Sequence, residues 1–202
     1  SHPHYQSAVA DGTGRGIAAG YWINAGGQSS ATLNVSADGH VALLTGSPDI
    51  GGSRASMALM AAEVLGIPIE TIHPQVVATD AVGYCDVTGG SRTTLATGQA
   101  VIQAADELVA ELCRRVALEW DVPEDEVTWS DGAAHHGEQS LTFEDFASRA
   151  NGMGGPLTVS SSLNSTSASP GFGVHLCDAE VDKETGRTTI TRYTVVQDAG
   201  KA

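Results

Sequence analysis

The sequence predicts an α+β fold in which mixed sheets carry helices packed on one side. Alternating apolar and polar residues, interrupted by short turns, predict strand pairs near both ends of the chain. Between them, two segments with apolar residues every three or four positions predict helices. Hairpins and strand–helix units therefore occur together, which is typical of this class. With 202 residues, 41% of them hydrophobic, the chain is long enough to bury a core.

Three strands are predicted in the first part of the chain. They cover residues 16–23, 30–35 and 41–44. The last two are joined across Asp38-Gly39, a turn signal that favours a hairpin.

Two amphipathic helices follow, over residues 54–65 and from about residue 93 to residue 120. Gly66 is expected to end the first helix, because glycine readily adopts the left-handed conformation found just after a last helical turn. A strand over 72–79 and a glycine-containing loop over 82–91 are expected between the two helices.

The last part of the chain is more polar. Thr142 and Asp145 have the spacing of a capping box and predict the start of a short helix. The remaining elements expected here are a strand over 126–129, surface loops over 151–156 and 160–169, and a second hairpin formed by 173–181 and 188–196. The chain stops directly after that hairpin, so we expect a C-terminal truncation.

The formal net charge of −14 argues against a nucleic-acid or anionic-membrane surface, because such partners would be repelled. No apolar run reaches the roughly 18 residues of a membrane span. Cys85, Cys113 and Cys177 are far apart and lack the spacing of a zinc or iron–sulfur site. We therefore expect no metal ligands in this chain, no nucleic acid, no membrane span and a cytoplasmic protein.

Two glycine-rich strings are the candidate binding residues, because each stands just before a predicted helix, where main-chain N–H groups can face an anion. They are Gly51, Gly52, Ser53 and Arg54 in the first string, and Gly89, Gly90, Ser91, Arg92 and Thr93 in the second. Neither has the spacing of a nucleotide-binding motif. A phosphate cradle and plain helix capping without a ligand are about equally compatible with them. The shared string Gly-Gly-Ser-Arg also suggests a weak structural repeat.

No catalytic residue is assigned. Asp49, Asp80 and Asp86 lie near the two strings and are candidate acids, but aspartate in such places more commonly forms turns. His135 and His136 are adjacent, which on a strand directs them to opposite faces and disfavours a shared metal.

Three longer strings resemble the large, molybdenum-binding subunit of the xanthine dehydrogenase, aldehyde oxidase and carbon monoxide dehydrogenase family. They run from Gly14 to Trp22, from Gly46 to Arg54 and from Asp86 to Thr94. The similarity extends in order over nearly the whole chain, through Gly66-Ile67-Pro68 and the closing residues 195–201. The resemblance implies that residues 1–202 are part of a molybdopterin-binding domain, with a division into lobes 1–122 and 123–202 left open.

The resemblance also implies a function. The family hydroxylates aldehydes or heterocycles with oxygen from water, using molybdopterin, with the cytosine dinucleotide form among the options. Electrons leave through iron–sulfur clusters and FAD on partner subunits or domains. Residues 89–93 would contact the cofactor through N–H and hydroxyl groups, and residues 51–53 would border it.

The sequence departs from the family at one position. Many members have Gly-Gln-Gly after the strand, whereas Gly52 stands at the glutamine position here. Ser53 or Arg54 is a candidate to replace that contact. The family's general base, a glutamate near the end of the large subunit, has no counterpart in this chain, so the fragment alone is expected to be inactive. The alternative function is a non-catalytic module that binds a phosphorylated small molecule.

Overall fold

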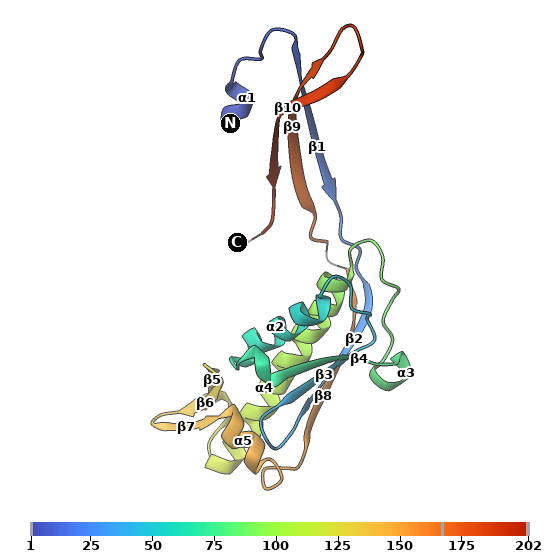
Figure 1. The fold of residues 1–202 in the computed structure, drawn as a ribbon. Helices are drawn as coiled ribbons and strands as arrows, with labels where there is room; N and C mark the ends of the chain where they lie inside the picture. Colours follow the sequence, from blue (N-terminus) through green and yellow to red (C-terminus); the bar gives the residue numbers. More distant parts are fainter. Residues whose placement is uncertain (1, 167, 201–202) are drawn as a thin grey trace. The chain divides into compact units, whose positions relative to one another are not determined.

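This computed structural model describes residues 2–166 and 168–200. The chain divides into two compact units: the terminal segments 1–24 and 168–202 form one, and residues 25–167 form the other (Figure 1). Residues 122 and 123, between which the sequence left a division into lobes open, both lie within the second unit.

A four-stranded sheet forms the centre of the second unit, with the strand order β4-β3-β2-β8. Its strands are β2 (Gly27–Val35), β3 (Val41–Thr45), β4 (Ile72–Val76) and β8 (Leu157–Ser165). β2 and β3 are antiparallel and form the hairpin predicted around Asp38-Gly39. β4 runs parallel to β3, so the sheet is mixed, as predicted.

The prediction of a surface loop over 160–169 is wrong where the chain forms β8. Hydroxyl groups of this strand bond to those of β2, with 2.8 Å between the oxygens of Ser30 and Ser162 and also between those of Thr32 and Ser160. These cross-strand bonds satisfy polar side chains within the sheet. A serine-rich strand therefore lacks the alternating hydropathy on which the sequence prediction relied.

Helices α2 (Ser53–Leu65) and α4 (Gly98–Trp120) pack on one face of this sheet (Figure 1). A short π-helix, Thr93–Thr97, leads directly into α4. Both predicted helices are confirmed, and Gly66 ends α2 with φ of +68°. The core between helices and sheet is built from small and branched side chains, including the fully buried Leu33, Leu43, Leu108 and Leu112.

The shorter elements of this unit depart more from prediction. They are α3 (Thr79–Val82), the 3₁₀ turns Ile69–Thr71 and Glu124–Glu126, β5 (Thr128–Ser130), β6 (Ala133–His136), β7 (Gln139–Thr142) and α5 (Phe143–Arg149). The strand predicted over 72–79 ends at Val76, and the sequence did not foresee β6 and β7. The start of α5 is as predicted, because the Thr142 hydroxyl accepts the N–H of Asp145 at 3.1 Å.

The other unit is a three-stranded antiparallel sheet with the order β1-β9-β10. It contains β1 (Thr13–Trp22), β9 (Gly171–Val181) and β10 (Thr188–Gln197), together with the short helix α1 (Pro3–Gln6). The second predicted hairpin is confirmed as β9 and β10. The pairing of β1 with β9, across the whole sequence, was not predictable from local patterns.

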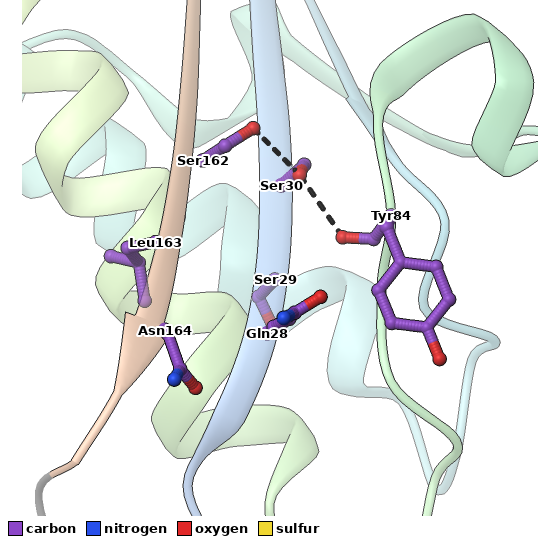
Figure 2. A pocket seen from close by; sticks show the side chains of 7 residues that line it. All are labelled: Gln28, Ser29, Ser30, Tyr84, Ser162, Leu163 and Asn164. Atoms are coloured by element: carbon purple, nitrogen blue, oxygen red, sulfur yellow. Dashed lines mark hydrogen bonds between the residues drawn. The ribbon is translucent and has the colours of Figure 1, made fainter.

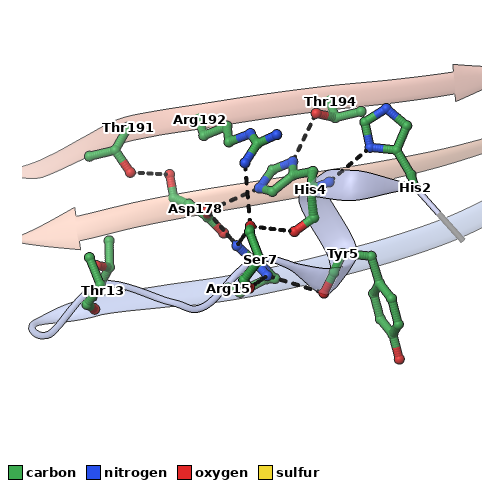
Figure 3. Close-up of polar contacts among 11 residues, drawn as sticks. His2, His4, Tyr5, Ser7, Thr13, Arg15, Asp178, Thr191, Arg192 and Thr194 are labelled. Carbon is green, nitrogen blue, oxygen red and sulfur yellow. Dashed lines mark hydrogen bonds and ion pairs between the residues drawn. The ribbon is translucent and has the colours of Figure 1, made fainter.

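A buried histidine fastens α1 to this sheet (Figure 3). His4 is fully buried, with Nε2 lying 3.0 Å from a carboxylate oxygen of Asp178 and Nδ1 lying 2.8 Å from the hydroxyl of Thr194. Arg15 donates to both oxygens of Asp178, at 2.7 and 2.8 Å. One carboxylate thus joins the N-terminal segment, β1 and β9.

Among the described residues, no helix is long and apolar enough to cross a bilayer.

Replacing Asp178 should change how stability depends on pH. The hydrogen bond from Arg15 holds the pKa of Asp178 well below its ordinary value of 3.8. A carboxyl whose pKa is lower in the folded chain adds stability above its unfolded pKa, and that stability is lost as the pH falls. The thermal midpoint of the wild type should therefore fall more steeply than that of Asp178→Asn between roughly pH 5 and pH 2. Asp11→Asn, which removes an exposed carboxylate of the same unit, is the control and should follow the wild type. Parallel curves for wild type and Asp178→Asn would contradict the expectation.

Replacing Gly66 by alanine should destabilise the second unit more than the same change at Gly137. Both glycines have positive φ, +68° and +57°, so alanine at either costs about 1 kcal/mol. A Cβ at Gly66 would in addition lie 2.5 Å from the backbone nitrogen of Gly132, whereas a Cβ at Gly137 would have no atom within 4 Å. Urea unfolding should show an extra loss of about 1–3 kcal/mol for Gly66→Ala, as expected for overpacking. Equal losses of unfolding free energy in Gly66→Ala and Gly137→Ala would mean that the contact with Gly132 does not destabilise the variant.

Candidate functional site

The first predicted string forms a tight turn before α2. The N–H of Ser53 donates to the carbonyl of Ile50 at 3.2 Å, and the two residues between them, Gly51 and Gly52, have φ of +61° and +88°. Successive positive φ values are those of a type I′ turn, which glycine adopts without strain. Both glycines are exposed, and no atom lies within 4 Å of a Cβ built on either.

Asp49 caps the helix that follows this turn. Its carboxylate accepts the N–H of Arg54 at 3.1 Å, the Arg54 Nε–H at 2.9 Å and the Ser53 hydroxyl at 3.3 Å. The backbone bond from Arg54 is the largest cause of the lowered pKa of Asp49. The N-terminus of α2 therefore faces a carboxylate of the chain itself, which is the turn-forming role expected for Asp49.

The second string forms a turn of the same kind before the π-helix. The N–H of Arg92 donates to the carbonyl of Gly89 at 3.3 Å, and the central residues Gly90 and Ser91 both have φ of +60°. Positive φ is strained for serine, unlike glycine. The carbonyl of Gly90 also accepts the N–H of Ala25 at 2.9 Å, which fixes the turn to the segment before β2.

The two turns share their geometry, but they are offset by one residue relative to the shared string Gly-Gly-Ser-Arg. The central pair is Gly51-Gly52 in the first turn and Gly90-Ser91 in the second. The two arginines consequently differ in position. Arg54 is the second residue of α2 and is exposed, whereas Arg92 is the last residue of its turn and is buried. The letters of the repeat do not describe equivalent positions.

Arg92 is buried, with only 4% of its surface exposed, and its guanidinium bonds to the chain itself. Nε donates to the carbonyl of Gly26 at 2.8 Å, and one terminal nitrogen donates to the carbonyl of Asp86 at 3.0 Å. The other terminal nitrogen donates to the carbonyl of Gln28 at 2.6 Å and to the hydroxyl of Ser29 at 2.7 Å. Arg92 thus holds Gly26 and the start of β2 against the second turn.

Asp86 fixes the same segment from the other side. Its carboxylate accepts the N–H of Gln28 at 2.6 Å, and its own N–H donates to the carbonyl of Gln28 at 2.9 Å. A Cβ at Gly27 would lie 2.4 Å from that carboxylate, so only glycine fits. Sequence reasoning missed this segment. The pair Gly26-Gly27 directly before an alternating strand was the signal that could have revealed it.

A polar hollow of about 290 Å³ opens beside this segment (Figure 2). It is lined by Gln28, Ser29, Ser30, Tyr84, Ser162, Leu163 and Asn164. The hydroxyl of Ser30 donates to the carbonyl of Tyr84 at 3.0 Å and lies 2.8 Å from the Ser162 oxygen. The hollow offers hydroxyl and amide groups but no charged side chain.

The remaining candidates do not join these turns. Thr93 is buried, and its hydroxyl lies 3.5 Å from that of Thr88. Asp80 is exposed in the first turn of α3. His135 and His136 lie on β6, bonded to the carbonyl of Ser130 and to Glu126. In residues 2–166 and 168–200, no group of three or more His, Cys, Asp or Glu side chains is arranged to hold a metal ion.

The exposed donors of the two turns are main-chain amides. The N–H groups of Gly51, Gly52, Gly90 and Ser91 donate to no group within the described part of the chain. By contrast, Arg92 is fully engaged by carbonyls and a hydroxyl, and Arg54 is paired with Asp49. These turns suit a ligand that accepts hydrogen bonds from the backbone. The alternative of a non-catalytic module for a phosphorylated small molecule gains no support from a free cation, because Arg54 is paired with Asp49 and Arg92 is engaged by the chain itself.

A family model for the molybdopterin cofactor-binding domain matches residues 4–202. The chain therefore belongs to this domain family, in the group of xanthine and carbon monoxide dehydrogenases that the sequence resembles. The carbon monoxide dehydrogenase large chain of Hydrogenophaga pseudoflava is 29% identical over 157 residues, which are 74% of this chain and 20% of that one. Xanthine dehydrogenase of Drosophila pseudoobscura pseudoobscura is 31% identical over 179 residues, which are 87% of this chain and 13% of that one.

The fold agrees with this assignment. Carbon monoxide dehydrogenase from Oligotropha carboxidovorans superposes with a TM-score of 0.84 at 24% identity, over 93% of this chain and 26% of that one. The chain thus spans about a quarter or less of the length of these proteins.

Removing Arg92 should weaken the fold whether or not a cofactor is bound. Arg92→Ala removes the guanidinium donor from the part-buried carbonyls of Gly26 and Asp86 and from the buried Ser29 hydroxyl, and one of two donors from the carbonyl of Gln28. Its free energy of unfolding should therefore fall by about 3 kcal/mol. Arg54→Ala removes an exposed ion pair and should stay close to the wild type. Urea unfolding of the cofactor-free chain measures both. A fully stable Arg92→Ala would show that the guanidinium is free for another role.

Proposed function

We propose that this chain is the part of a molybdenum hydroxylase large subunit that cradles molybdopterin. The whole enzyme would be an oxidoreductase that hydroxylates an aldehyde or an N-heterocycle with oxygen from water. The observation that carries the proposal is the pair of matching turns, whose central amides are exposed and unbonded within the described residues, in a chain of this domain family.

The residues present fit such a cofactor. Pterin ring atoms and phosphate oxygens accept hydrogen bonds, and the amides of Gly51, Gly52, Gly90 and Ser91 can donate them. These groups carry no net charge, so they bind an anionic group without the arginine pair that the sequence suggested. Ser91, exposed at the centre of the second turn, adds a hydroxyl.

Each predicted residue takes a defined part in this proposal. Gly51, Gly52, Gly89, Gly90 and Ser91 form the exposed surface, while Ser53 and Arg92 hold it in shape. Arg54 is paired with Asp49 and Thr93 is buried, so neither is part of this surface. Ser53 is buried and bonded to the N–H of Ile50 at 3.0 Å, so it does not replace the glutamine missing at Gly52. The surface at Gly52 stays open, and recognition there falls to the backbone.

When bound, molybdopterin supplies the molybdenum at which the family's oxygen transfer takes place. The residues of this chain bind and orient the cofactor, and none of them is proposed to move a proton in the reaction. Catalytic groups and the substrate pocket would belong to the remainder of the molybdenum subunit. Electron acceptors would belong to iron–sulfur and flavin subunits, as the family resemblance implies.

The direct test is to express the complete gene with its neighbours and measure molybdenum by mass spectrometry and pterin by fluorescence after oxidation. The proposal expects both in the purified complex, close to one per molybdenum subunit. An intact complex without molybdenum or pterin would overturn it.

A side chain at Gly89 should block the cofactor without harming the fold. Gly89 is exposed, its φ is not positive, and no atom lies within 4 Å of a Cβ built there. Gly89→Leu should keep the wild-type thermal midpoint but lower the pterin content of the complex about tenfold, the equivalent of 1.4 kcal/mol of binding. Gly152→Leu is the matched control, since Gly152 is also exposed and free of strain but lies in another turn. Full pterin in Gly89→Leu would exclude the second turn from the cofactor surface.

A further inference from the structure

A threonine that the proposed cofactor surface does not use lies between the two turns. Thr97, the last residue of the π-helix, has 0% of its surface exposed. Its hydroxyl oxygen lies 2.7 Å from that of Ser47 and 3.2 Å from that of Ser29. Both serines are buried as well, with 3% and 1% exposed. We call these three residues the hydroxyl bridge.

The hydroxyl bridge connects the supports of both turns. At one end, Arg92 donates to the Ser29 hydroxyl at 2.7 Å, and in each of the pairs Ser29–Thr97 and Thr97–Ser47 either hydroxyl can be the donor. At the other end, Ser47 belongs to the segment that leads into the first turn, and its N–H donates to the hydroxyl of Thr45 at 3.2 Å. A single series of hydrogen bonds thus runs from Arg92 in the second turn to the segment that leads into the first turn.

The backbone geometry suits this role. A π-helix inserts one residue into a helix and frequently marks a functional site. Directly after Thr97, a Cβ at Gly98 would lie 2.6 Å from the sulfur of Met60, so α4 and α2 approach closely at this point. The helices that follow the two turns, α2 and α4, therefore pack against each other next to Thr97.

We propose that Thr97 is a positioning residue that sets the spacing between the two turns, and that Ser47 is its partner in this role. The inference rests on the proposed function, because the spacing matters if one cofactor contacts both turns. Thr97 itself is buried and acts through Ser47 and Ser29 without touching the cofactor. When the donors of both turns are already correctly spaced before the ligand arrives, less ordering is needed on binding. The ligand is then bound more tightly and released more slowly.

The test compares Thr97→Val, which keeps the volume and removes the hydroxyl, with Thr97→Ser, which restores it. Thr32→Val is the matched control: Thr32 is 8% exposed and its hydroxyl pairs with Ser160 at 2.8 Å, but on β2 and β8 away from both turns. All are made in the complete molybdenum subunit and purified as the complex. Thermal midpoint, pterin content and the rate of pterin release during dialysis are measured for each.

Thr97→Val removes the hydrogen bonds to Ser47 and Ser29, so it should release pterin at least about fivefold faster than the wild type, while Thr97→Ser restores the slow rate. Thr32→Val should lose a similar amount of thermal stability but release pterin at the wild-type rate. Ser47→Ala removes only the bond to Thr97, so it should speed release, but by no more than Thr97→Val does. The double variant should be no faster than Thr97→Val, because that change already removes the bond to Ser47.

Several results would overturn the inference. Wild-type release from Thr97→Val, equal acceleration by Thr32→Val, or additive effects in the double variant would each show that the spacing is not set here. If Thr97→Val fails to fold, Thr97→Ser and Ser47→Ala decide the question by the same release rate. A wild-type complex without pterin would instead refute the proposed function, which keeps the two failures distinct.

Discussion

The guanidinium of Arg92 is the group on which the candidate site depends. A buried cation must find acceptors for its hydrogen bonds, and Arg92 finds them in three backbone carbonyls and one hydroxyl. Those acceptors belong to Gly26, to the start of β2 and to Asp86, which is far from the others in sequence. Hydrogen bonding of this one guanidinium therefore requires the start of β2, the loop at Asp86 and the second turn to lie together. The exposed amides of Gly90 and Ser91 lie directly beside this junction and take their orientation from it.

In the proposed function, this arrangement lets an acidic protein bind a ligand with anionic groups. The chain has a formal charge of −14, and the two arginines nearest the turns are satisfied by the protein itself. Recognition that relied on free cations would compete with many carboxylates. Main-chain amides avoid that competition, because they are dipoles fixed by turn geometry. Glycine supplies the geometry at Gly51, Gly52 and Gly90, where φ is positive.

Patterns local in the sequence predicted much of the fold. Both long helices, the Gly66 helix end, the Thr142 cap and two hairpins follow from periodicity and turn residues within a short window. The prediction failed where side chains were polar but paired. β8 carries serines that bond to hydroxyls of β2, so its hydropathy resembles that of a loop. The same limit applied to Arg92, whose partners come from residues 26–29 and 86.

The sequence by itself determined the class of fold, the family and the positions of the two glycine strings, because each depends on the order and type of neighbouring residues. Only the tertiary structure decided what each residue in those strings does. The strings read alike, yet their turns are centred one residue apart, so Arg54 is exposed beside Asp49 and Arg92 is buried among carbonyls. The reason is physical: whether an arginine binds a ligand or the protein depends on which acceptors folding brings within hydrogen-bond distance. The two arginines looked equivalent in the sequence, but in the structure Arg54 pairs with Asp49 at the surface and Arg92 is a buried support of the second turn.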